Sequence, residues 1–146
     1  MEKELLDKVQ LNRHKYGQTI LDALKDQIYE CERYKVNFSL ALGATLSDID
    51  MHKFSEMIRE TDKFIILDNN ICCIVFPFTD YAQGVKAASN LLSKFEMKFF
   101  SEKIYLGIAN TEECPAPDIH VQQLFDILIY AVSNGMNNLP IDSTSF

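Results

Sequence analysis

Two apolar runs separated by a short polar turn constrain the fold of this chain more than any other feature. The runs cover residues 64–67 and 71–76, and the residues between them are Asp68, Asn69 and Asn70. Asp and Asn tolerate the left-handed backbone that tight turns often need. The pattern therefore predicts a β-hairpin with its turn at these three residues.

Apolar spacing on either side of the hairpin predicts the remaining elements. Ser47 followed by Asp50 predicts a capping box that opens a short helix running through residues 57–58, and Asp80 predicts the start of a later helix. The same patterns predict a helix over residues 12–34, strands over 36–46 and 104–109, and a last helix that ends near Gly135. This order contains the β-α-β-β-α-β unit of ferredoxin-like folds. We therefore expect an α/β (α+β) domain with a central, mainly antiparallel sheet flanked by helices.

Length and charge limit the class of protein. The chain has 146 residues, 47% of them apolar, which suits a single domain over residues 1–146 with a packed core. Within it we expect residues 1–11 to be a lead-in and residues 140–146 a tail, which is either a loose end or a short last strand. The net charge of −7 argues against a general nucleic-acid binder, because such proteins present a basic face to phosphates.

Cysteine usage and hydropathy indicate the compartment. No apolar run approaches the length of a membrane span, so we expect no membrane insertion, and the N-terminus lacks the order of a signal peptide. The cysteines are Cys31, Cys72, Cys73 and Cys114, without a C-x-x-C pair. We expect free thiols in a reducing cytoplasm, with Cys72 and Cys73 on opposite faces of one strand.

Several short motifs occur in order along most of the chain. They are Asn12-Arg13, Arg33-Tyr34 before Phe38-Ser39-Leu40, Arg59 with Asp62, Phe76-Pro77, Gly107-Ile108-Ala109 and Gly135-Met136-Asn137. Together these motifs resemble the landmarks of GGDEF domains, the catalytic domains of diguanylate cyclases. The resemblance implies a nucleotide-cyclase-like version of the fold above and a role in bacterial signal transduction.

The departures from the family pattern all remove catalytic groups. Active members carry Gly-Gly-Asp/Glu-Glu-Phe at the hairpin turn, whereas this chain carries residues 68–72, Asp-Asn-Asn-Ile-Cys. The alignment places Ala44 and Leu46 at acidic positions, Ile71 at the Glu and Val132 at a phosphate-contacting Lys. Hydrocarbon side chains cannot ligate Mg²⁺, which requires oxygen. We expect a degenerate domain with no enzymatic activity, no catalytic residues, no metal site and no cofactor.

One functional motif of the family is retained. Arg59 and Asp62 match R-x-x-D, the inhibitory site of cyclases, which non-catalytic relatives use as a receptor site for cyclic di-GMP. If both residues share a helix face, the Arg fork can meet guanine O6 and N7 while the carboxylate accepts from guanine N1 and N2. The alternative is a helix-end salt bridge in which Asp62 merely caps the turn into the next strand.

Two functions follow from these observations. The first is a non-catalytic cyclic di-GMP receptor that uses Arg59 and Asp62 as ligand-binding residues. The alternative is a nucleotide-independent dimerisation or protein-interaction domain derived from a cyclase. Inhibitory sites often recruit a second arginine from the following helix, but here that helix offers only Lys86 and Lys94. The protein partner is unknown, with a second copy of the chain as one candidate.

Overall fold

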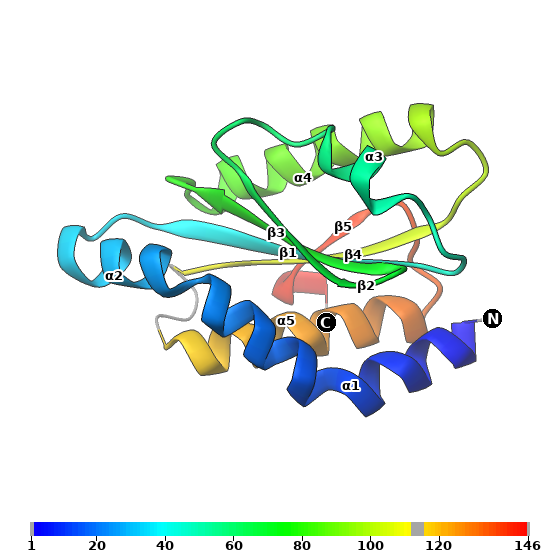
Figure 1. Cartoon of the computed structure of the whole chain (residues 1–146), viewed down its shortest axis with the longest axis horizontal. Coiled ribbons are helices and arrows are strands. Elements are labelled where there is room, and N and C mark those ends of the chain that lie inside the picture. Colours follow the sequence, from blue (N-terminus) through cyan, green and yellow to red (C-terminus); the bar gives the residue numbers. More distant parts are fainter. Residues whose placement is uncertain (1, 112–115, 146) are drawn as a thin grey trace.

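The computed structural model describes residues 2–111 and 116–145, and their strands form one five-stranded sheet in the order β2-β3-β1-β4-β5 (Figure 1). The strands are β1 (Phe38–Thr45), β2 (Lys63–Asp68), β3 (Ile71–Pro77), β4 (Ile104–Asn110) and β5 (Pro140–Ile141). The pairs β1–β3, β1–β4 and β2–β3 are antiparallel, and β4–β5 is parallel. The predicted central, mainly antiparallel sheet is confirmed.

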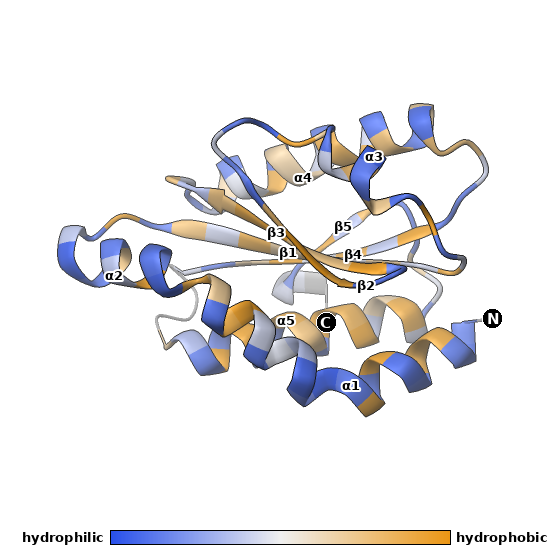
Figure 2. Cartoon of the chain, viewed as in Figure 1, coloured by the Kyte–Doolittle hydropathy of each residue, from blue (hydrophilic) through white to orange (hydrophobic). Residues whose placement is uncertain are grey.

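Helices cover both faces of the sheet (Figure 1). One layer contains α1 (Glu2–Ala23), α2 (Lys25–Tyr34) and α5 (Pro117–Ser133), and the other contains α3 (Met51–Ser55) and α4 (Tyr81–Lys98). Every residue of β1 and β4 is therefore buried, and the core divides into one cluster on each side of the sheet. Figure 2 shows the apolar strands between helices whose outer faces are hydrophilic.

The first helix is longer than the sequence predicted and is kinked. It begins at Glu2 rather than near Asn12, so the expected lead-in over residues 1–11 is helical from Glu2 onward. Leu5 and Val9 in that segment are buried and extend the apolar stripe toward the N-terminus. At Leu24 the backbone leaves helical geometry, but its N–H still bonds Ile20 O at 3.0 Å and its carbonyl accepts from Ile28 N at 2.9 Å. The helical hydrogen bonds between residues four apart therefore continue across the kink.

The short helix after β1 differs from the predicted one at both ends. Asp50 is its N-cap and accepts from the backbone N–H groups of His52 and Lys53, whereas the Ser47 hydroxyl donates to Glu102 instead. The predicted capping box of Ser47 and Asp50 is therefore wrong. The helix ends at Ser55, so residues 57–62 form a turn region before β2. This leaves Arg59 off any helix.

The hairpin lies where the sequence predicted it, with a different turn geometry. Asp68 pairs with Ile71, leaving Asn69 and Asn70 as the loop. None of these four residues has a positive φ, and a register shift between Ile66 and Asp68 marks a bulge. Bulges increase local twist, so the reversal forms without the left-handed residue that the Asp and Asn side chains suggested.

The cysteines of the described segments are unpaired. Cys73 packs in the cluster beneath α1 and α5, and Cys72 packs in the cluster beneath α4, which confirms the opposite faces. Burial raises the pKa of the Cys72 thiol to about 12. Cys114 lies outside the described residues. Across residues 2–111 and 116–145, no helix combines the length and hydropathy of a membrane span.

Candidate functional site

A hollow of about 430 Å³ lies where the turn before β2, the end of β3 and one side of α4 meet. We call it the Arg59 pocket. Its polar lining residues include Arg59, Asp62, Gln83, Lys86, Asn90 and Lys94. Its apolar lining residues include Phe76 and Phe78. Both residues of the R-x-x-D motif thus line one pocket together with the two lysines of α4.

Arg59 and Asp62 are brought together by a turn and not by a helix face. The backbone N–H of Asp62 donates to Arg59 O at 3.0 Å, which closes the turn. The Asp62 carboxylate in return accepts from the Arg59 backbone N–H at 3.0 Å. The expectation of a shared helix face is wrong because α3 ends before the motif. A turn closed at i and i+3 brings the two side chains together just as well.

The ion pair fixes the orientation of the Arg59 guanidinium. Arg59 Nε lies 3.0 Å from both Asp62 oxygens, and Arg59 Nη2 lies 2.7 Å from Asp62 Oδ1. The Asp62 side chain is only 1% exposed, whereas that of Arg59 is 50% exposed. Hydrogen bonding to Asp62 raises the pKa of Arg59, so the cation is retained. The carboxylate is thus directed at the arginine, while half of the arginine faces solvent.

The side-on pairing leaves the outer edge of the guanidinium available. Within the described segments Nη1 has no hydrogen-bond partner, and guanidinium has five donors in a planar fork. The Arg59 Cζ atom also lies 5.7 Å from the centroid of the buried Phe76 ring, within cation–π range. Arg59 is therefore held from two sides and can offer a bidentate donor edge to a planar acceptor.

The α4 wall carries a row of polar side chains. Lys86, Asn90 and Lys94 are spaced four residues apart, so they share one face of the helix, and all three are exposed. Neither lysine has an ion pair or hydrogen bond to another of the described residues. With Arg59 balanced by Asp62, the two ammonium groups leave the lining positive in a chain of net charge −7. Such a site favours an anion.

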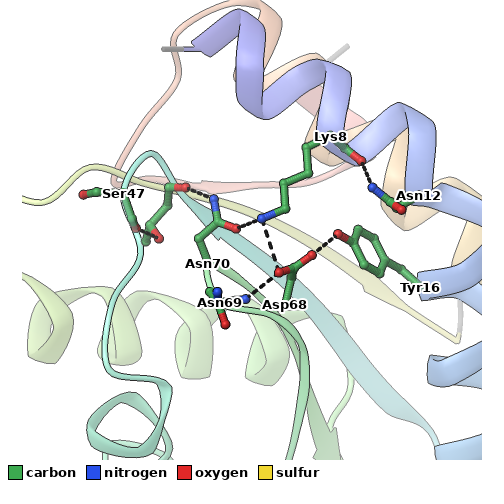
Figure 3. Close-up of polar contacts among 8 residues, drawn as sticks. Lys8, Asn12, Tyr16, Ser47, Asp68, Asn69 and Asn70 are labelled. Atoms are coloured by element: carbon green, nitrogen blue, oxygen red, sulfur yellow. Dashed lines mark hydrogen bonds and ion pairs between the residues drawn. The ribbon is translucent and has the colours of Figure 1, made fainter.

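The hairpin turn, in contrast, is filled by the protein itself. Lys8 of α1 donates from Nζ to Asn70 Oδ1 at 2.7 Å and lies 3.3 Å from Asp68 Oδ1 (Figure 3). The Tyr16 hydroxyl donates to Asp68 Oδ2 at 2.6 Å. The buried Asn70 amide donates to Thr45 O at 2.8 Å. Hydrogen bonding from Tyr16 first, and from Asn69 N–H and Lys8, lowers the pKa of Asp68.

The positions aligned with catalytic groups are packed with hydrocarbon. Ala44 lies directly opposite Ile71 in the β1–β3 register, and both are buried. Val132 is buried in the same cluster, and Leu46 packs against it. In the described part of the chain no group of three or more His, Cys, Asp or Glu side chains is placed to hold a metal. The side chains at these four positions are hydrocarbon and carry no oxygen or nitrogen atom.

Comparison with protein-family models and with curated protein sequences gave no match. Solved structures do match. The GGDEF domain of FimX from Pseudomonas aeruginosa has a TM-score of 0.64 at 16% identity, covering 86% of this chain and 92% of that one. The coiled coil and GGDEF domain of DgcB from Caulobacter crescentus, in complex with c-di-GMP, has a TM-score of 0.68 at 11% identity, covering 97% and 94%.

A third match is the GGDEF domain of YfiN (TpbB) from Pseudomonas aeruginosa, with a TM-score of 0.69 at 11% identity, covering 83% of this chain and 91% of that one. The fold is that of a GGDEF domain. At such low identity the likeness establishes the fold alone, so ligand and activity must be argued from this chain's own residues.

Two features of the site were missed by sequence reasoning. Lys8 lay outside the helix predicted over residues 12–34, and Tyr16 lay inside it without a predicted role, although the stripe formed by Leu5, Val9 and Tyr16 indicates that the helix starts early. Phe78 lines the pocket and is 65% exposed. No local pattern marks it, because its exposure depends on how α4 packs beside the end of β3.

Proposed function

We propose that this chain is a non-catalytic receptor domain that binds cyclic di-GMP in the Arg59 pocket and reports it to a protein partner. The observation that carries the proposal is the guanidinium of Arg59, which Asp62 pairs side-on and which lines a pocket with half of the side chain exposed. Guanine presents O6 and N7 as adjacent acceptors in one plane, and arginine meets that pair with two parallel hydrogen bonds. Two solved structures of one structural relative, DgcB from Caulobacter crescentus, are described in complex with c-di-GMP.

The roles of the two motif residues differ in this proposal. Arg59 is the ligand-contacting residue. Asp62 positions it, because both of its oxygens already accept from Arg59 and its side chain is only 1% exposed. Direct acceptance by Asp62 from guanine N1 and N2 would require this ion pair to open. We therefore assign guanine recognition to Arg59 and the orientation of its fork to Asp62.

The lysines of α4 supply the charge that a dianionic ligand needs. Cyclic di-GMP carries two phosphodiester groups, and Lys86 and Lys94 lie two helical turns apart on the wall facing Arg59. Flexible ammonium groups act as point charges rather than planar forks. We assign them to phosphate attraction. In this role they replace the second arginine that inhibitory sites often recruit.

The proposal excludes cyclase activity for the same chain. Ala44, Leu46, Ile71 and Val132 leave no oxygen or cation at the positions that the family resemblance assigns to metal and phosphate. Incubation with GTP and Mg²⁺ should give no cyclic dinucleotide. Product above an enzyme-free control, abolished by EDTA, would contradict this part of the proposal.

Calorimetric titration with cyclic di-GMP tests the receptor role. Arg59→Ala should weaken binding by roughly 10- to 100-fold, the effect of one bidentate base contact of about 1–3 kcal/mol. Arg59→Lys should also weaken it, because the charge stays and the fork is lost. Arg33→Ala is the matched control, since Arg33 is exposed on α2 and removes the same charge away from the pocket.

Each variant needs a urea unfolding curve, because loss of Arg59 leaves the Asp62 carboxylate buried without its partner. Affinities are compared only where the variant is folded. No heat of binding from the parent at high ligand concentration would overturn the proposal and favour the interaction-domain alternative. Equal affinity in the parent and both Arg59 variants would overturn the assignment of Arg59.

A further inference from the structure

Phe78 combines a left-handed backbone conformation with an exposed aromatic side chain. It follows β3 immediately and has φ 56°, in the left-handed region that bulky residues rarely adopt. Its side chain is 65% exposed, and it has no aromatic or cation–π partner in the parts of the chain that the structure describes. A strained residue is usually retained for burial or for function. Burial does not explain this one.

The turn that carries Phe78 is held firmly on both sides. Thr79 is buried, and its hydroxyl lies 2.8 Å from Phe76 O and 2.9 Å from Ser39 Oγ. Asp80, the next residue, caps α4 in a capping box with Gln83. The backbone at Phe78 is thus pinned between the sheet and the start of α4. The ring is presented at the pocket from a rigid support.

Phe78 and Arg59 line the same hollow and offer complementary contacts to a nucleobase. The outer edge of Arg59 presents in-plane donors, whereas an exposed phenyl ring presents an apolar face. A purine needs both, because its edge carries the hydrogen-bonding groups and its faces stack on aromatic rings. Neither contact substitutes for the other.

We propose that Phe78 is a specificity-determining residue of the Arg59 pocket. Its ring stacks on the purine base whose edge Arg59 binds. This inference rests on the proposed cyclic di-GMP receptor function and extends it from a charged site to one that recognises a large flat base. The left-handed backbone at Phe78 is then tolerated for binding and not for folding. Its removal should cost affinity and not stability.

The test compares Phe78→Asn, Phe78→Trp and the control Tyr34→Asn by calorimetry with cyclic di-GMP and by urea unfolding. Asn accepts the left-handed backbone, so Phe78→Asn should unfold at the same or higher urea concentration while its affinity falls about tenfold, a typical loss for one stacked base. Phe78→Trp should keep parental affinity or exceed it. Tyr34 is similarly exposed, at 62%, but lies on α2, and its substitution should leave binding unchanged.

The outcomes separate this inference from the function on which it rests. Unchanged affinity in Phe78→Asn, with Arg59→Ala still weakened, overturns the stacking role and leaves the receptor function standing. A parallel loss of stability and affinity in Phe78→Asn overturns it too, because the ring would then be structural. If the parent binds no cyclic di-GMP, the receptor function and the stacking role are both wrong.

Discussion

The two ends of β3 carry polar residues that are used in opposite ways. At its start, the hairpin turn is bound by Lys8 and Tyr16 of α1, and the neighbouring side chains of Ala44 and Ile71 pack in the hydrophobic core. At its end, roughly 20 Å away for a seven-residue strand, the Arg59 pocket keeps an outward guanidinium edge, two lysines and an exposed ring. Polar groups that satisfy one another's hydrogen bonds stabilise the fold, whereas polar groups that line a hollow without such partners are available to bind a ligand.

The largest effect is expected from a substitution that removes hydrogen bonds at the hairpin turn. Asn70→Ala removes the acceptor of Lys8 and the donor to Thr45 O at a buried position. Loss of two hydrogen bonds should lower the free energy of unfolding by about 2–3 kcal/mol, measured by urea denaturation. Affinity for cyclic di-GMP should not change, because the pocket is at the other end of β3.

Asn69→Ala is the matched control for that prediction. Asn69 is the neighbouring loop residue, is exposed, and its side chain makes no hydrogen bond to the described residues. It should change the free energy of unfolding by less than about 0.5 kcal/mol. Equal costs for Asn69→Ala and Asn70→Ala would show that the network does not stabilise the turn.

A smaller loss of stability is expected for Tyr16→Phe in the same hairpin network, and this loss should depend on pH. Tyr16→Phe removes the hydrogen bond that contributes most to lowering the pKa of Asp68 below its ordinary value of 3.8. A carboxylate with a lowered folded pKa adds stability above its unfolded pKa and loses it as pH falls through the folded value. At pH 7 the variant should therefore be less stable by about 1–2 kcal/mol.

The gap between parent and Tyr16→Phe should shrink below about pH 4, as Asp68 becomes protonated in the unfolded chain and then in the folded one. Unfolding free energies measured from neutral to acidic pH provide the check. A gap that stays constant or widens on acidification would mean that Tyr16 stabilises the fold by packing, independently of Asp68.

The smallest expected effect concerns the charges of the pocket. Lys86→Gln and Lys94→Gln should each weaken cyclic di-GMP binding about three- to fivefold at low salt, since exposed charges interact by about 1 kcal/mol or less. The loss should fade at high salt. Lys98→Gln, on the same helix but outside the pocket lining, should bind like the parent. If Lys86→Gln, Lys94→Gln and Lys98→Gln all bound cyclic di-GMP as tightly as the parent, the two lysines of the pocket would have no role in binding.

The sequence could predict the strands and the hairpin because their signals are local. Apolar runs and alternation report burial directly, and the confirmed positions of β1, β3 and β4 follow from them. The start of α1 was missed because the prediction rested on the apolar spacing in the second half of the helix, although Leu5 and Val9 already carry the helical spacing. The capping box at Ser47 failed because Asp50 competes for the same role.

The candidate site could be predicted only in part. The spacing of Arg59 and Asp62 predicts proximity in a helix and in a turn alike, so the pair was found while its local structure was not. That Lys86 and Lys94 face the same pocket depends on the packing of α4 against the sheet. The exposure of Phe78 and the closure of the hairpin by Lys8 depend on contacts between distant segments, which no local pattern encodes.

The most direct test of the account is a map of backbone amide NMR shifts during titration of the parent chain with cyclic di-GMP. The account predicts that the largest changes fall on Arg59, Phe78 and the part of α4 from Lys86 to Lys94, and that Asn69, Asn70 and α1 remain unperturbed. Shifts concentrated at the hairpin turn and α1, with the Arg59 pocket silent, would contradict the account, and so would a spectrum that does not respond to the ligand at all.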